Sequence, residues 1–216
     1  MDKLSQNYRN DDVSTLSAEV KDYLDQNFFQ KLDNLHSVNP RVLVVFSGGS
    51  AVGKSALSQR IKEELGAIVL ENDAIKACLL EWKPNLAKAE LNAWTWQYSM
   101  NLYPRLGELT PNGLVVRDGV IDWYYDRILP VFAQQGYQIF TIGYDVSRAK
   151  REALIQQRGD KQTITSSRLM QLIDEQDQHI ARYRAEHTPD IILTDDNMFD
   201  YEPVIAKLRE RLEAAK

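Results

Sequence analysis

The stretch "FSGGSAVGKSALSQRI", residues 46–61, decides the fold class of this chain. Its first half matches the pattern G-x-x-x-x-G-K-[ST], the signature of a loop that wraps around nucleotide phosphates. Glycine suits such a loop because the backbone must turn its N–H groups toward an anion, which side chains would obstruct. We therefore expect a nucleotide-binding loop built from Gly48, Gly49, Ser50, Ala51, Val52, Gly53, Lys54 and Ser55.

The sequence on either side supplies the structural context that this loop requires. "RVLVVF", residues 41–46, is typical of a buried strand, and "SALSQRIKEEL", residues 55–65, carries apolar residues at helical spacing. The N-terminus of that helix adds a partial positive charge beside the phosphates. We expect Lys54 to reach the β- and γ-phosphates and the Ser55 hydroxyl to bind Mg²⁺. The alternative is a glycine-rich turn followed by a surface lysine.

Short apolar runs alternate with helical patterns along the rest of the chain. This alternation predicts a parallel sheet covered by helices on both faces. We expect an α/β, three-layer P-loop NTPase fold with a five-stranded, mostly parallel sheet and a helical lid at about residues 146–175. Ligands of such sheets bind at the carboxyl ends of the strands. After the first strand, the others are expected at residues 66–73, 114–116, 137–145 and 190–196.

The first part of the chain predicts an amphipathic helix ahead of the main domain. Its apolar residues recur at steps of three and four: Leu16, Val20, Leu24, Phe28, Leu32 and Leu35. We expect residues 1–40 to form a helical extension that packs on the sheet, and residues 41–216 to form the nucleotide-binding domain. A partner-binding helix is the alternative for the extension.

Composition narrows the class of protein. The chain of 216 residues is 44% hydrophobic and 26% charged, with no run of about 20 apolar residues to cross a bilayer and no apolar signal segment at its N-terminus. Cys78 is the single cysteine, which favours a reducing cytoplasm. The net charge of −5 argues against a broad nucleic-acid surface. We expect a cytoplasmic protein that binds neither membranes nor nucleic acids.

Acids at predicted strand ends are candidates for phosphoryl-transfer chemistry. Asp73 ends the second strand, where it can act as a base on an acceptor hydroxyl in line with the γ-phosphate; capping of the next helix is the alternative. Lys76, one turn later, can pair with an anionic acceptor group or lie in solvent. Asp118 follows the run Leu114–Val116, and we expect it to hold the Mg²⁺ shell and to lie among the substrate-binding residues.

Arginines in the expected lid are candidates for charge stabilisation. Arg151 and Arg158 are seven residues apart and share a helix face. Arginines from a closing lid neutralise charge on a transferring phosphoryl group, and closure excludes water. Solvated surface arginines are the alternative.

Together, "FSGGSAVGKS", "GAIVLENDAIK", "LVVRDG" and the arginine-bearing lid resemble the adenylate-kinase-like group of small P-loop kinases. Within that group, the long first helix and "ENDAIK" resemble the zeta toxin family, and the "GGS" opening resembles chloramphenicol phosphotransferases. Zeta toxins phosphorylate a hydroxyl of UDP-N-acetylglucosamine. The resemblance implies ATP and Mg²⁺ at Lys54 and Ser55, Asp73 as the base, a small-molecule hydroxyl acceptor such as a UDP-sugar, and an antitoxin-like protein inhibitor.

The chain departs from the zeta toxin pattern in two places. No His-Pro pair follows "ENDAIK", and the third strand leads into "DGVIDWYYDR" without a Thr-x-Arg sequence. Both departures concern the acceptor pocket, so the resemblance supports a kinase more firmly than a UDP-sugar acceptor.

Two other functions stay open from the sequence. One is a nucleotide-gated regulatory NTPase that acts on a protein partner; the missing Asn-Lys-x-Asp motif and the missing Asp-x-x-Gly after the third strand favour a kinase instead. The other is a nucleoside, nucleotide or polynucleotide 5′-hydroxyl kinase, for which the basic residues of the lid would have to offset the negative net charge.

Overall fold

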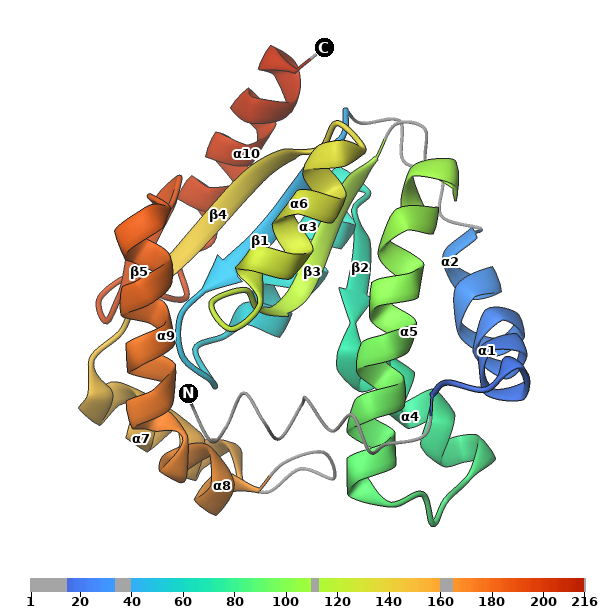
Figure 1. The fold of residues 1–216 in the computed structure, drawn as a ribbon. Coiled ribbons are helices and arrows are strands. Elements are labelled where there is room, and N and C mark those ends of the chain that lie inside the picture. The colour runs from blue at the N-terminus through green and yellow to red at the C-terminus, as the bar shows by residue number, and fades with distance from the viewer. Residues whose placement is uncertain (1–14, 34–39, 110–112, 160–164, 216) are drawn as a thin grey trace. The chain divides into compact units, whose positions relative to one another are not determined.

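The computed structural model describes residues 15–33, 40–109, 113–159 and 165–215. Contacts divide the chain into two compact units (Figure 1). The first unit combines Met1–His36 with Glu71–Leu109, and the second combines Ser37–Leu70 with Thr110–Lys216. The second unit carries the glycine-rich loop. The division of the chain at residue 40 into an extension and a nucleotide-binding domain stays a prediction.

A five-stranded parallel sheet forms the centre of the second unit, as predicted. The strand order is β2-β3-β1-β4-β5, with β1 parallel to both β3 and β4, and β4 parallel to β5. The central strand β1 is buried along its whole length because both of its edges and both of its faces are covered. The strands are β1 (Val42–Ser47), β2 (Ile68–Glu71), β3 (Leu114–Val120), β4 (Gln138–Asp145) and β5 (Ile191–Thr194).

Helices cover both faces of this sheet, which confirms the three-layer α/β architecture. On one face, Leu57 and Ile61 of α3 and Leu208 of α10 join the core formed by alternate residues of β1 and β4. On the other face, the Tyr183 hydroxyl of α9 hydrogen-bonds the Thr141 hydroxyl of β4 at 2.9 Å. Figure 1 shows α6 on the side of the sheet opposite α3. The helices of this unit are α3 (Lys54–Leu65), α6 (Tyr125–Gln134), α7 (Arg148–Arg158), α8 (Ser166–Gln171), α9 (Ile173–Glu186) and α10 (Glu202–Ala214).

The segment expected to form the lid is helical where the structure describes it. It comprises α7, α8 and the start of α9, and residues 160–164 lie outside the described residues. Ile155, Leu169 and Ile173 form a small apolar cluster that joins the three helices. Their mutual packing makes α7 to α9 one connected element that begins directly after β4.

The first unit is helical and is organised around Asp25. The predicted N-terminal helix is interrupted by a π-helical turn, and the expected apolar position Leu35 lies outside the described residues. The Asp25 carboxylate accepts hydrogen bonds from Tyr98 (2.8 Å) and Arg105 (2.6 Å) of α5 and from Lys21 (2.5 Å). The elements are α1 (Ala18–Leu24), η2 (Asp25–Phe29), α2 (Gln30–Asp33), α4 (Asn72–Trp82) and α5 (Lys88–Leu109).

No helix among the described residues is both long and apolar enough to cross a membrane.

Candidate active site

The glycine-rich loop joins β1 to α3 at the carboxyl edge of the sheet, and its backbone explains two of its glycines. Gly48 has φ +149°, and a Cβ there would lie 2.7 Å from the Tyr144 Cβ. Gly53, the N-cap of α3, has φ +92°, in the left-handed region that other residues rarely adopt. A side chain at Gly48 would push β4 away from the loop, so this position requires glycine for packing as well as for conformation.

Lys54 is the first residue of α3 and is half-buried beneath the loop. Its ammonium group donates a hydrogen bond to the Gly49 carbonyl oxygen. Burial lowers the pKa of Lys54 to about 8, and the nearby positive charges of Arg158 and Arg151 act in the same direction. The carboxylates of Asp118 and Asp122 act against this lowering. A bound polyanion would therefore strongly stabilise the charged form of Lys54.

The electrostatics of Lys54 also show which predicted residues gather at the loop. Asp118, Arg151 and Arg158, all expected from the sequence to serve phosphoryl transfer, interact with its charge. Arg151 on α7 is buried, and its side chain lies against Gly49, where a Cβ would meet the guanidinium at 2.7 Å. Arg158, in the last turn of α7, is half-buried. Neither arginine is the solvated surface residue of the alternative interpretation.

Asp122 contacts the loop directly, although the sequence analysis did not select it. Its side chain is buried, and Oδ2 accepts a hydrogen bond from the Gly48 N–H at 2.9 Å. Burial raises the pKa of this carboxyl group, and the Gly48 N–H and the charge of Lys54 oppose the rise. Asp122 lies beyond the end of β3, outside any apolar run, so no local pattern pointed to it.

Gln176 is a second contact that the sequence analysis missed. It is buried on α9, where its Oε1 accepts a hydrogen bond from the Ser50 N–H (3.0 Å) and its Nε2 donates to the Ser50 hydroxyl (2.9 Å). Backbone N–H groups of this loop are the donors that the motif presents to phosphate. A phosphate oxygen that accepted a hydrogen bond from the Ser50 N–H would therefore have to displace the Gln176 amide oxygen.

The two residues expected to bind Mg²⁺, Ser55 and Asp118, stay candidates for that role. Ser55 is exposed at the second position of α3, and Asp118 is half-buried in β3 within electrostatic reach of Lys54. Among the described residues, no group of three or more His, Cys, Asp or Glu side chains is placed to hold a metal. A hydroxyl and one carboxylate suit Mg²⁺, which takes one or two protein ligands together with nucleotide phosphates and water.

Asp73 and Lys76 lie on α4 in the first unit, and they contact one another. The N-cap of α4 is Glu71, so Asp73 lies in the first turn of the helix and is not the capping residue. The Lys76 ammonium is 3.3 Å from Asp73 Oδ1, and the Asp73 side chain is 60% exposed. Lys76 is thus paired with the candidate base, and the roles of both residues toward an acceptor stay predictions.

Comparison with known proteins places the chain in a family. A model of the AAA domain family AAA_33 matches residues 43–183. This chain belongs to that family. No curated protein matches it significantly.

Solved structures with the same fold as this AAA-domain protein include several kinases. A chain of the PezAT chromosomal toxin–antitoxin system of Streptococcus pneumoniae aligns with TM-score 0.58 and 12% identity, covering 90% of this chain and 97% of that chain. Shikimate kinase from Bacteroides thetaiotaomicron aligns with TM-score 0.52 and 17% identity, covering 80% of this chain and 98% of that chain. A gluconokinase from Sinorhizobium meliloti aligns with TM-score 0.51 and 16% identity, covering 83% of this chain and 97% of that chain. These likenesses confirm the predicted fold, which this chain shares with a chain of a toxin–antitoxin system and with two small-molecule kinases.

Proposed function

We propose that this AAA-domain protein is an ATP-dependent kinase that transfers the γ-phosphate of ATP to a hydroxyl group of a small molecule. The observation that carries the proposal is the arrangement around Lys54. A half-buried lysine with a depressed pKa lies at the first residue of α3, next to a loop that matches the phosphate-binding motif. Arg151 and Arg158, which belong to the lid, add positive charge that acts on Lys54.

Each protein group has one task in the transfer. The acceptor oxygen forms a bond to the γ-phosphorus while the bond from that phosphorus to the β–γ bridging oxygen breaks, so that ADP leaves. The proton of the acceptor hydroxyl passes to the Asp73 carboxylate. Lys54, Arg151 and Arg158 neutralise charge on the transferring group, which is the main contribution of a protein to phosphoryl transfer. Ser55 and Asp118 would hold Mg²⁺, which neutralises the phosphate oxygens when bound.

For the acceptor, we propose a UDP-sugar as the first compound to test. The support is the "ENDAIK" resemblance together with the fold shared with a chain of the PezAT toxin–antitoxin system. The same likeness supports an antitoxin-like protein as a binding partner. The proposal of a UDP-sugar acceptor would be wrong if nucleosides, nucleoside monophosphates or amphenicol-type alcohols stimulated ATP consumption and UDP-sugars did not.

The decisive experiment measures ADP release by the purified protein with ATP and Mg²⁺ across that panel of acceptors. We expect one acceptor class to stimulate turnover, Lys54→Ala to abolish it, and Asp73→Asn to lower it at least ~10²-fold with ATP binding retained. Asp126→Asn is the matched control, because Asp126 is also an exposed acid in the first turn of a helix.

Two results would contradict the proposal. Full activity of Asp73→Asn would remove Asp73 from the mechanism. Slow ATP hydrolysis that no acceptor stimulates, but that a protein partner changes, would identify a regulatory NTPase instead.

A further inference from the structure

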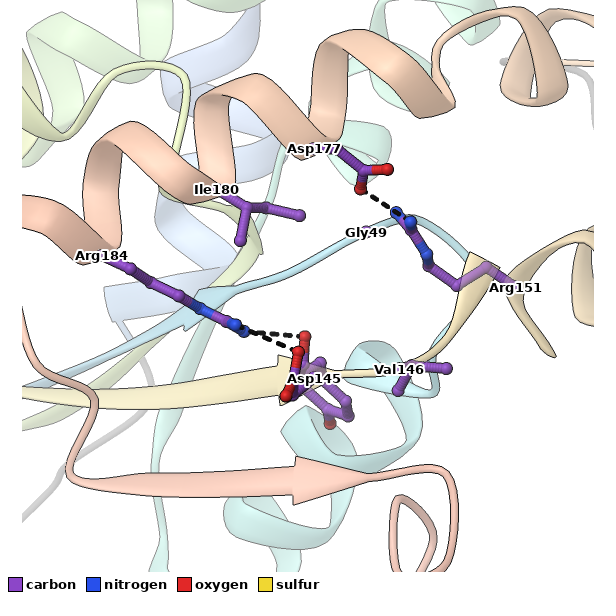
Figure 2. Close-up of a pocket in the computed structure, with 8 residues that line it drawn as sticks. Gly49, Asp145, Val146, Arg151, Asp177, Ile180 and Arg184 are labelled. Atoms are coloured by element: carbon purple, nitrogen blue, oxygen red, sulfur yellow. Dashed lines mark hydrogen bonds and ion pairs between the residues drawn. The ribbon is translucent and has the colours of Figure 1, made fainter. Parts of the chain in front are cut away.

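A cavity of about 110 Å³ lies beside the loop, between the end of β4 and the helix α9 (Figure 2). All of its lining residues belong to the second unit. Pockets for drug-sized ligands measure roughly 300–1,000 Å³, so this cavity is too small for a nucleotide. Its volume suits a few water molecules or one small ion.

Two arginines enter this cavity from different helices. Figure 2 shows Arg151 reaching in from α7, above Gly49, and Arg184 reaching in from α9 toward the end of β4. Arg151 Nη2 lies 2.6 Å from Asp177 Oδ1. Arg184 Nη2 donates to the Tyr144 carbonyl oxygen at 2.9 Å, and its Nη1 lies 3.3 Å from an Asp145 carboxylate oxygen.

Several hydrogen-bond donors at this cavity lack an acceptor. Among the described residues, eight buried side-chain polar atoms have no hydrogen-bond partner, and three of them belong to the two arginines that line the cavity: Arg151 Nε, Arg151 Nη1 and Arg184 Nε. The Arg151 side chain is only 6% exposed, so bulk water does not satisfy its unused N–H groups. Buried donors of this kind require an acceptor, and guanidinium groups prefer an oxyanion.

The carboxylates that pair with the two arginines are exchangeable partners. Asp177 is 45% exposed and Asp145 is 70% exposed, so water screens their attraction for the guanidinium groups. An anion inside the cavity would meet the same guanidiniums on their buried side, where screening is weaker. Lys54 adds positive charge nearby, since its charge interacts with that of Arg151.

We propose that this cavity is a binding site for a small tetrahedral oxyanion, such as a phosphate or sulfate group, held by Arg151 and Arg184. The inference goes beyond the proposed function, because this anion is additional to the phosphates that the loop itself holds. The oxyanion is either a free ion or the terminal group of a larger ligand.

The test is isothermal titration of inorganic phosphate into the Lys54→Ala variant, in which the loop no longer competes strongly for phosphate. We expect saturable binding, weakened about tenfold or more by Arg184→Gln, because that change removes charge-assisted hydrogen bonds. Arg182→Gln is the matched control, since Arg182 lies on the same helix but stacks over the Tyr125 ring, outside the cavity. Equal affinity of the two arginine variants, or no phosphate binding, would overturn the proposal.

A second variant tests the site without removing a buried residue. Asp145→Asn frees Arg184 from a competing, exposed carboxylate and should tighten phosphate binding about threefold. Unchanged or weaker binding in this variant, with its thermal stability intact, would contradict the proposal even if Arg184→Gln failed to fold.

The source of the anion follows from titrations of the unaltered protein. If a non-hydrolysable ATP analogue blocks phosphate binding and ADP does not, the cavity holds the terminal phosphate of the nucleotide, and the proposal of an additional anion is overturned. If phosphate binds alongside the analogue, the site takes a separate anion. None of these titrations requires phosphoryl transfer. A negative result would therefore not contradict the kinase proposal, and a lack of kinase activity would not contradict this anion site.

Discussion

ATP affinity should depend steeply on pH through Lys54. The structure holds the pKa of this lysine at about 8, compared with its ordinary value of 10.5. The phosphates of ATP favour the charged lysine, so binding should return the pKa at least to its ordinary value. The group is charged below pH 8 and neutral above it in the free protein. Binding at higher pH must therefore take up a proton.

The size of the effect follows from that pKa. Between pH ~7.5 and pH ~9, the Kd for ATP should rise about eightfold, and proton uptake on binding should rise from about 0.2 to about 0.9 per molecule. Calorimetric titrations in buffers of different ionisation enthalpy measure both quantities. The range avoids the titration of ATP itself at lower pH.

Lys54→Arg is the control, because a guanidinium stays charged throughout this range. We expect its ATP affinity to be nearly independent of pH. A flat Kd in the parent protein, or the same slope in the arginine variant, would refute the assignment of a depressed pKa to Lys54.

Three further substitutions test contacts described above. Gln176→Ala should tighten ATP binding about tenfold, measured by fluorescence titration, because the amide no longer competes for the Ser50 N–H. Gly48→Ala should abolish ATP binding and lower the free energy of unfolding by ~1–3 kcal/mol, since the new Cβ would lie 2.7 Å from Tyr144 Cβ. Asp25→Ala should lower the free energy of unfolding, measured by urea denaturation, by about 3 kcal/mol, because it leaves three donors without their shared acceptor.

Matched controls separate these effects from general damage. Gln178 is exposed on the same helix as Gln176, and Asp22 is exposed in the same helix as Lys21, so their alanine variants should behave like the parent. Gly136→Ala places a Cβ in open space at φ +78° and should cost only the left-handed backbone penalty, with ATP binding retained. A control variant as strongly affected as its counterpart would contradict the corresponding contact.

Most of the fold was predictable because each strand is a short apolar run bounded by turn residues. The exception is β3, which continues from Val116 to Val120 through Arg117 and Asp118. The register shifts between the pairs Val44–Val116 and Phe46–Val120, because β3 has more residues than β1 over this stretch. Pairing of this kind depends on the neighbouring strand, so the hydrophobic pattern of residues 114–120 did not reveal it.

The candidate site was predictable only where a local motif carries it. Lys54 and its loop follow from residue spacing alone. Gln176 reaches Ser50 across 126 positions of sequence, and Asp122 reaches Gly48 across 74. Those contacts form because α9 and the turn after β3 both reach the loop at the carboxyl edge of the sheet. The pattern of a single sequence does not show which distant segments come into contact.

The strand order also has a consequence for how the chain folds during synthesis. β1 is made first but has no sheet neighbour nearby in the sequence, because Val42 pairs with Leu114 on one side and with Gln138 on the other. Closing such long loops is slow, since their entropy must be lost before the pairing energy is gained. The fully buried strand β1 therefore leaves the ribosome well before the two strands that cover its edges. During that interval the nascent chain presents a bare β1, which makes it the segment that a chaperone would bind.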